Sequence, residues 1–272
     1  MKISVIVVTW KGDELLANCL GSLSQVYGNS LEIVVVDNAN LESTRSVTAK
    51  YANVKYEAAE SNLGFAGGNN LGLKYCTGEY ILLLNNDTIV HEDSFGPMAS
   101  FMDEHPRVGI VQGTMVIPGF GLDDCGTMMT PLGIQRHLHR GEELPRAALG
   151  ARKVTAAKGA MMMIRRKAIE DAGFLFYDHF KSYFEETDFC RRAANCGWEC
   201  WFVPTPPIDH LCGATSSKFK RDEVWTQYFR NIFYSFARNW GWWGKFVMLP
   251  AFACAAALKS PKNFIKAIKE DI

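Results

Sequence analysis

The chain has 272 residues, of which 48% are hydrophobic and 21% charged, a composition typical of a globular protein with one large domain or two small ones. Basic and acidic residues both number 29, so the formal net charge is zero and no overall basic field favours a nucleic-acid partner. The eight cysteines include no Cys-x-x-Cys pair, which argues against a structural zinc site and favours a reduced, cytoplasmic compartment.

The first hundred residues alternate between strand-like and helix-like patterns. An apolar run at residues 3–9 is too short for a secretion signal and predicts a first strand, and leucines at helical spacing follow it. Further apolar runs at residues 31–36, 54–58 and 79–90 repeat the pattern. Four such alternations predict an α/β fold with a mostly parallel sheet, right-handed crossovers and flanking helices.

The run from Glu79 to Val90 ends in Asn85-Asn86-Asp87, and it reads as a strand buried on both faces. Ligands of open parallel sheets bind beyond the carboxyl ends of the strands, so Asp87 is placed to hold a phosphate-bound cation. The alternative is an ordinary turn, which asparagine and aspartate also favour.

The second half is less regular. Residues 108–117 resemble another strand, residues 118–158 predict irregular strands with a mobile acceptor-binding loop, and residues 198–203 resemble a last strand. We therefore expect a domain over residues 1–225, with a nucleotide-binding half (1–105) and an acceptor-binding half (106–225), and a helical aromatic and basic extension over residues 226–272.

The extension alternates aromatic and basic residues from Tyr228 to Trp243 and then has an apolar stretch from Phe246 to Leu258. These thirteen or so residues fall short of the roughly 20 that span a bilayer. Tryptophan and lysine flanks favour an interfacial helix with peripheral membrane contact. The alternative is a helix that packs on the domain or in a homodimer interface.

Acidic and imidazole side chains follow several predicted strands or begin a predicted helix: Asp37, Asp87, the Glu185-Glu186-Asp188 group and His210. Each has a structural explanation, because aspartates cap turns and helices, Asp188 can pair with Arg191 or Arg192, and a histidine can be a bonded loop residue. Their shared position on one rim of one sheet favours a functional site.

The chemistry of these groups suits transfer from a diphosphate donor to an acceptor hydroxyl. A divalent cation held by Asp87 and His210, Mn or Mg, would neutralise a diphosphate leaving group. A carboxylate near Glu186 could deprotonate an acceptor hydroxyl. Neighbouring helical residues point about 100° apart, so either Glu185 or Glu186 is expected to be structural. The glycine-rich Asn62 to Asn70 matches neither a P-loop nor a dinucleotide fingerprint, but its N–H groups could bind a phosphate or sugar.

In order along the chain, the motifs resemble those of family 2 glycosyltransferases, particularly bacterial rhamnosyltransferase-like members, over about residues 3–240. They are Ser4-Val5-Ile6-Val7-Val8-Thr9, Val34-Val35-Val36-Asp37-Asn38, Asn62-Leu63-Gly64-Phe65-Ala66-Gly67-Gly68-Asn69, Leu83-Leu84-Asn85-Asn86-Asp87, Phe184-Glu185-Glu186-Thr187-Asp188 and His210. The resemblance implies a GT-A fold and an inverting, metal-dependent hexosyltransferase that uses a nucleotide diphosphate sugar.

The resemblance also implies roles for individual residues. Asp37 would meet the nucleotide base, the metal-binding D-x-D element falls on residues 85–87 with Asn85 in place of its first carboxylate, and Glu186 takes the position of the catalytic acid. The candidate site residues are, for catalysis, Glu186, Glu185 and Asp188; for substrate binding, Thr9, Trp10, Asp37, Asn38, Asn62, Gly64, Phe65, Asn69, Asn86 and Gly159; and for metal binding, Asp87 and His210.

The expected partners are a nucleotide diphosphate sugar donor and a glycan or lipid-linked acceptor in bacterial surface polysaccharide synthesis, at the inner face of the cytoplasmic membrane. A sugar nucleotidyltransferase is one alternative, although Trp10-Lys11-Gly12-Asp13 is a poor version of its basic glycine-rich loop. A non-catalytic nucleotide-sugar binding module is another. A retaining hydrolase would need two carboxylates that straddle the bond, and the nucleotide-type sheet disfavours it.

Overall fold

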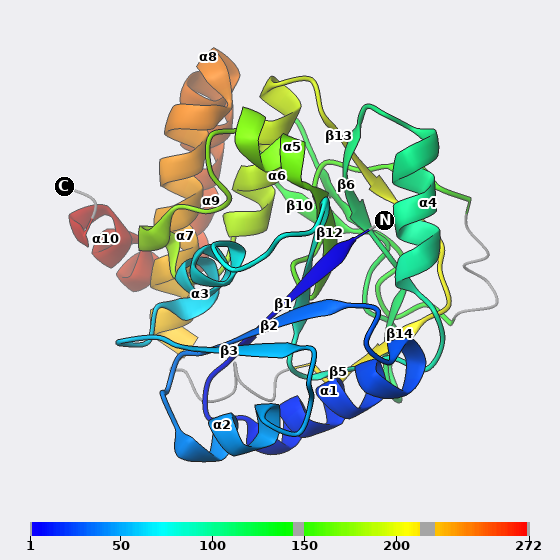
Figure 1. The fold of residues 1–272 in the computed structure, drawn as a ribbon. Coiled ribbons are helices and arrows are strands. Elements are labelled where there is room, and N and C mark those ends of the chain that lie inside the picture. The colour runs from blue at the N-terminus through cyan, green and yellow to red at the C-terminus, as the bar shows by residue number, and fades with distance from the viewer. Residues whose placement is uncertain (1, 144–149, 213–220, 271–272) are drawn as a thin grey trace.

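The computed structural model describes residues 2–143, 150–212 and 221–270. An eight-stranded sheet lies at its centre (Figure 1). Its strands are β1 (Ile3–Thr9), β2 (Glu32–Asp37), β3 (Val54–Ala58), β4 (Tyr80–Asn85), β6 (Val108–Gln112), β11 (Arg152–Lys153), β12 (Met161–Arg165) and β13 (Glu199–Phe202). In space their order is β11-β13-β6-β12-β4-β1-β2-β3.

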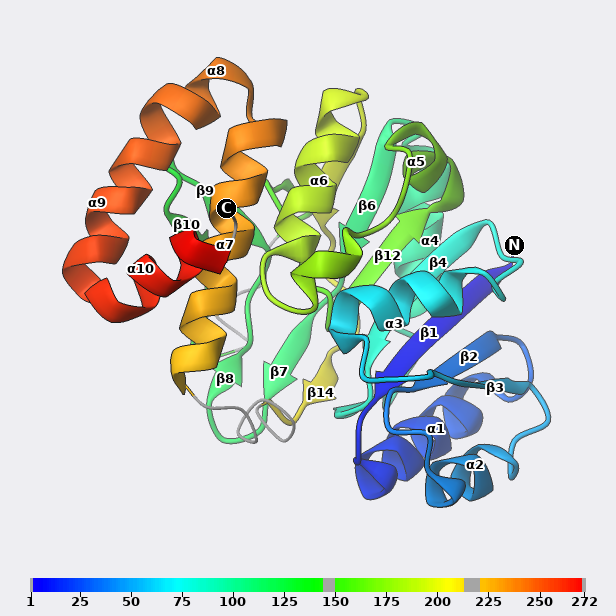
Figure 2. The ribbon, with the colours of Figure 1, turned by 90° about the vertical axis from the view of Figure 1, so that its left-hand side faces the viewer.

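The predicted alternation in the first half is confirmed. Strands β3, β2, β1 and β4 pair in parallel, and the connecting helices are α1 (Asp13–Tyr27), α2 (Glu42–Thr48) and α3 (Gly64–Leu73). Helix α3 covers one face of these strands and α1 and α2 the other (Figure 2). Because both faces are covered, apolar residues such as Val5, Ile6 and Val7 are fully buried, which explains the unbroken apolar runs.

The second half departs from a purely parallel sheet. Strand β12 runs antiparallel between β4 and β6. The single strand expected over residues 108–117 is wrong, because β6 ends at Gln112 and Met115–Ile117 forms β7 in a second sheet of order β5-β14-β7-β8. At the break, the backbone amide of Thr114 donates to the Thr205 hydroxyl, and the amide of Thr205 donates to the Thr114 hydroxyl. This pair of bonds redirects the chain. The other strands of this sheet are β5 (Thr88–Ile89), β8 (Gly121–Leu122) and β14 (Ile208–His210).

Residues 198–203 are therefore not the last strand, since β14 follows and pairs with β5 and β7. A strand of three residues has too little periodicity to be recognised from sequence. The remaining elements are the hairpin β9 (Thr127–Met129) and β10 (Gln135–His137), helices α4 (Phe95–Glu104), α5 (Arg166–Asp171) and α6 (Glu185–Asn195), and the short 3-10 helix η2 (Asp178–Phe180). The mobile loop expected in this region falls partly on residues 144–149, which lie outside the described residues.

The C-terminal helices pack on the domain beside α6 (Figure 2). They are α7 (Arg221–Asn239), α8 (Gly241–Trp243), the π-helical turn η4 (Gly244–Met248), α9 (Leu249–Lys259) and α10 (Pro261–Glu270). The ring of Phe252 packs against those of Phe229, Phe233 and Phe236, which joins α9 to α7. The helical segment Gly241–Leu258 has 18 residues with mean hydropathy 1.3, so by length and composition alone it could cross a membrane, and 17% of it is buried. It starts five residues before the apolar stretch expected from sequence.

Candidate active site

A cavity of about 520 Å³ lies at the carboxyl ends of β1 and β4, a volume typical of small-molecule sites. The start of α6, the β9–β10 hairpin and Tyr228 of α7 form its other walls. Eleven of the fifteen candidate site residues line it: Thr9, Trp10, Asn38, Asn62, Gly64, Phe65, Asn86, Asp87, Glu185, Glu186 and His210.

Four candidate residues do not line the cavity. The Asp37 carboxylate is fully buried and accepts hydrogen bonds from the amides of Ala39 and Leu41 and from the Tyr56 hydroxyl, so it holds the turn after β2. Asn38, on that turn, faces the cavity instead. The buried Asn69 amide donates to the carbonyl of Phe65 within α3 (2.9 Å).

Asp188 and Gly159 lie behind the cavity wall. The guanidinium of Arg192 donates to one Asp188 oxygen at 2.9 Å and the Asn239 amide to the other at 2.6 Å, so Asp188 links α6 to α7. The amide of Gly159 donates to Glu186 Oε1 at 3.2 Å. A Cβ at Gly159 would come within 3.0 Å of Glu186 Cγ and 2.8 Å of the Phe65 ring, so glycine leaves the space that Glu186 occupies.

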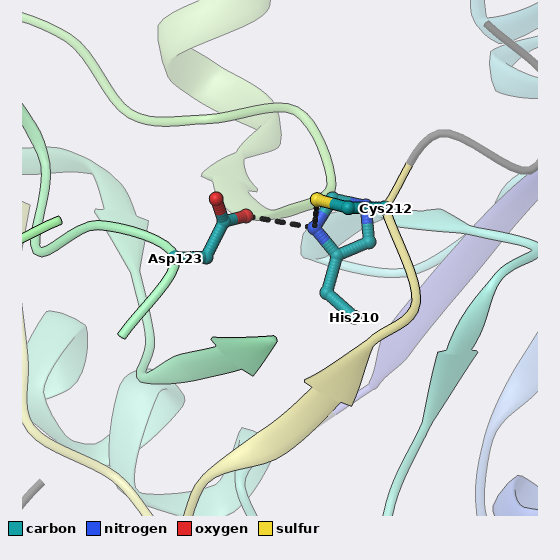
Figure 3. A group of neighbouring side chains, drawn as sticks. All are labelled: Asp123, His210 and Cys212. Atoms are coloured by element: carbon teal, nitrogen blue, oxygen red, sulfur yellow. Dashed lines mark hydrogen bonds and ion pairs between the residues drawn. The ribbon is translucent and has the colours of Figure 1, made fainter. Parts of the chain in front are cut away.

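The imidazole of His210 lies between two carboxylates, those of Asp87 and Asp123, and Figure 3 shows it facing the second of them. Pairing of β14 with β5 sets His210 opposite Thr88, the neighbour of Asp87. His210 Nε2 is 3.4 Å from Asp87 Oδ1, and Nδ1 is 2.7 Å from Asp123 Oδ2. Burial lowers the pKa of His210, but the hydrogen bond to Asp123 and the nearby carboxylate of Asp87 outweigh it and raise the pKa to about 11.

Asp123 is a site residue that the sequence analysis missed. It is fully buried, and His210, Lys158 and Arg140 all donate to it. Burial raises its pKa, yet these cationic partners outweigh burial and hold the pKa well below the usual range. Two adjacent acids in an irregular region, Asp123 and Asp124, were the only sequence signal, and their partners are visible only in the fold.

The donor set around His210 fits a divalent cation on the side of Asp87. Asp87 Oδ1 is buried without a hydrogen-bond partner, and carboxylate with imidazole suits Mn²⁺. A second group with close ligand atoms comprises Asp123, His210 and Cys212 (Figure 3). Its thiol favours softer metals, and Asp123 already binds Lys158 and His210. Asp123 therefore serves to orient the imidazole, as carboxylates behind metal-binding histidines do.

The two glutamates begin α6, where the partial positive charge of the helix end favours anions. Glu185 is 3% exposed and its Oε2 has no hydrogen-bond partner. Burial, together with the charge of Glu186, raises the pKa of Glu185 well above its usual value. Burial also raises the pKa of Glu186, and the N–H of Gly159 partly offsets this. Glu186 is the less buried of the two.

The family model of glycosyl transferase family 2 matches residues 4–173. The chain belongs to this family. The hexosyltransferase Agl10 of low-salt glycan biosynthesis in Haloferax volcanii is 27% identical over 199 residues, which cover 70% of this chain and 61% of that protein. The poly(ribitol-phosphate) beta-N-acetylglucosaminyltransferase TarS of Staphylococcus aureus is 32% identical over 111 residues, which cover 39% of this chain and 19% of TarS. The glycosyltransferase thus spans under two thirds of the length of both relatives.

Solved structures show the same GT-A fold. One of them is the mannosyltransferase PcManGT of Pyrobaculum calidifontis in complex with GDP-Man and Mn²⁺. It superposes with a TM-score of 0.62 at 15% sequence identity, and the match covers 99% of this chain and 86% of PcManGT. TarS residues 1–349 in complex with UDP-GlcNAc superpose with a TM-score of 0.61 at 19% sequence identity. The match covers 100% of this chain and 80% of that TarS chain. The α/β fold and the family resemblance expected from sequence are confirmed.

One wall of the glycosyltransferase cavity joins three segments far apart in sequence. The hydroxyl of Tyr228 on α7 donates to Gln135 Oε1 at 2.9 Å, and Gln135 Nε2 donates to Thr187 Oγ1 at 2.8 Å. This chain of bonds fixes the hairpin and α7 beside the first turn of α6. No sequence pattern indicates that Gln135 and Tyr228 share a site.

The raised pKa of Glu185 predicts a pH-dependent effect on stability. The pKa of Glu185 is higher in the folded than in the unfolded protein, so between the two pKa values the folded state binds more protons. The free energy of unfolding therefore decreases as pH rises from the unfolded pKa through the folded pKa. Glu185→Gln should therefore raise the Tm more at pH 8 than at pH 5, as measured by calorimetry.

Glu199→Gln is the matched control, because the hydrogen bond from Lys153 lowers the pKa of Glu199. Glu199 gives stability that is present above its unfolded pKa, so this variant should lower the Tm at pH 8. A Glu185→Gln shift that is the same at both pH values would contradict the assignment.

Proposed function

We propose that this glycosyltransferase moves a hexose from a nucleotide diphosphate sugar to an acceptor hydroxyl with inversion at the anomeric carbon, and that Glu186 is the general base. The observation that carries the proposal is that one cavity holds Glu186 on one wall and Asp87 and His210 on another. A sugar between these walls would have its leaving group on one side and the base on the other.

The donor side of the cavity is built from the ends of β1, β2 and β4. Thr9, Trp10 and Asn38 line it where the nucleoside would bind, and Asp37 acts through the turn that carries Asn38. Asn86 Nδ2 donates to Thr9 Oγ1 at 2.8 Å, which fixes the two strand ends relative to each other. Asp87 and His210 would hold Mn²⁺ or Mg²⁺, and the bound cation would neutralise charge on the diphosphate.

The transfer step needs one base and no protein nucleophile. The acceptor oxygen forms the new bond to the anomeric carbon while its proton passes to the Glu186 carboxylate. The bond to the diphosphate breaks, and its electron pair leaves with the phosphate oxygen. The raised pKa of Glu186 makes its carboxylate a stronger base than an exposed glutamate.

The acceptor is proposed to be a lipid-linked glycan at the inner face of the cytoplasmic membrane, with rhamnose as the transferred sugar, as the motif resemblance suggests. Trp242, Phe246 and Leu258 are 65%, 72% and 88% exposed. Five lysines and no acidic residue occur in the segment from Trp240 to Lys269, with Lys269 included. Exposed aromatic residues with lysines suit the headgroup region of an anionic bilayer. Since α9 packs on α7 along one side, this surface supports peripheral contact.

Replacing the base should separate chemistry from binding. Glu186→Gln keeps the shape of the side chain but cannot accept the acceptor proton, so kcat should fall about 10²- to 10⁴-fold while nucleotide affinity stays within about twofold. Transfer of labelled sugar and calorimetric titration with nucleotide would measure the two quantities. Glu170→Gln, an exposed acid on α5, is the control. Near-normal turnover of Glu186→Gln would reassign the base.

Metal dependence is tested by removal and replacement. We expect chelator treatment to abolish transfer and added Mn²⁺ or Mg²⁺ to restore it, because the leaving diphosphate would otherwise carry uncompensated charge. Asp87→Asn should raise the metal concentration needed for half-maximal activity by about tenfold or more. Full activity in excess chelator would remove the metal from the mechanism.

Membrane contact is tested without any substrate. Trp242→Ser combined with Phe246→Ser should weaken co-sedimentation with phosphatidylglycerol vesicles by about tenfold or more, because two exposed rings would no longer insert. Tyr75→Ser, at an exposed aromatic residue after α3, should bind like the wild type. Equal vesicle binding by the double variant and the wild type would contradict the assignment. So would a wild type that does not bind vesicles, combined with a double variant that turns a dimer into a monomer.

A further inference from the structure

The loop that precedes the two glutamates has an unusual backbone. Lys181, Tyr183 and Phe184 have φ values of 54°, 72° and 73°, in the left-handed region that residues other than glycine rarely adopt. Phe184 is also the N-cap residue of α6, so this backbone sets the direction in which Glu185 and Glu186 leave the loop. Such a conformation persists only when surrounding contacts hold it.

Helix α7 supplies most of those contacts. Asn231 Nδ2 lies 2.9 Å from the carbonyl oxygen of Phe180, 3.0 Å from that of Ser182 and 2.6 Å from that of Tyr183. Three acceptors around one nitrogen require the amide to present its NH₂ group there. Gln227 Nε2, one turn earlier, also donates to the carbonyls of Phe180 and Ser182.

The other side of the loop contacts the glycine-rich start of α3. The amide of Ala66 donates to the carbonyl of Lys181 at 2.7 Å, and a Cβ at Gly64 would lie 2.6 Å from that oxygen. Each carbonyl from Phe180 to Tyr183 therefore has a donor from α3 or α7. The loop is fixed between the donor-binding segment and the C-terminal extension.

From these contacts we infer that Asn231 and Gln227 are positioning residues of the transfer reaction, which hold loop 180–184 so that Glu186 faces the acceptor hydroxyl. The inference rests on the proposed function, because it takes Glu186 as the base. Asn231 is fully buried, and its amide contacts backbone carbonyls of the loop and not the Glu186 carboxylate. It therefore acts through the loop backbone. Helix α7 then positions the catalytic group, whereas α9 and α10 make none of these contacts to the loop.

The decisive readout is kcat against donor affinity. Asn231→Leu keeps the volume and removes the donors, so kcat should fall about 10- to 100-fold, the cost of a small displacement of a catalytic group, with nucleotide affinity within about twofold. Asn263→Leu is the matched control, since the buried Asn263 joins α10 to Asp222 of α7 and lies away from the loop; its kcat should be unchanged. If Asn231→Leu does not fold, Gln227→Ala, at a half-buried position, carries the same test.

A double-variant cycle separates positioning from mere stability. In the Glu186→Gln background, Asn231→Leu or Gln227→Ala should lower the residual kcat by less than about twofold, because the base on which they act is gone. A further fall equal to that in the wild type, or an unchanged kcat in the single variants, would overturn the inference. Near-normal turnover of Glu186→Gln alone would instead refute the proposed base, so the two failures are distinguishable.

Discussion

The arrangement of the site depends on the contacts that the buried imidazole of His210 makes with Asp87 and Asp123. Asp87 follows β4 of the regular first half, whereas Asp123 follows β8 and His210 ends β14 in the irregular second half. Buried carboxylates are costly unless they are paired; Lys158 and Arg140 supply the compensating charge at Asp123, and the His210 imidazole bridges Asp123 to Asp87. The electrostatic balance of the cluster thus requires both halves to meet at the cavity.

The C-terminal extension completes the opposite wall. Tyr228 lines the cavity and is joined to Thr187 of α6 through Gln135, Asn231 binds the loop before α6, and Asn239 binds Asp188 near the start of the same helix. Helix α7 therefore fixes the first turn of α6, which carries both glutamates, at three points. The segments outside residues 4–173, where the family model matches, provide Glu186, His210 and α7. The cavity is thus lined by residues from inside and from outside that range.

Much of this site could be predicted from sequence because it lies at the ends of periodic elements. The runs before Thr9, Asp37 and Asp87 are buried on both faces, so their ends and the edge they share are readable. Position alone could not separate Asp37 and Asp188, whose carboxylates hold a turn and a helix pair, from Asp87 and Glu186, which face the cavity. Asp123 and Asn231 had no such pattern, because their roles come from partners on other elements, 17 to 87 residues away for Asp123 and 48 to 51 for Asn231. The division of residues 108–117 into β6 and β7, at Gly113 and Thr114, could not be predicted because apolar residues occur on both sides of it.

The anomeric configuration of the product tests the central claim most directly, that Glu186 acts as a single base in a direct displacement. Incubation with a nucleotide sugar of known configuration and an acceptor, followed by proton NMR of the product before any equilibration, reads the new linkage. Inversion relative to the donor is predicted, because the acceptor attacks from the face opposite the diphosphate. Retention would contradict it, since retention requires a second displacement or a front-face reaction that the proposed roles do not provide.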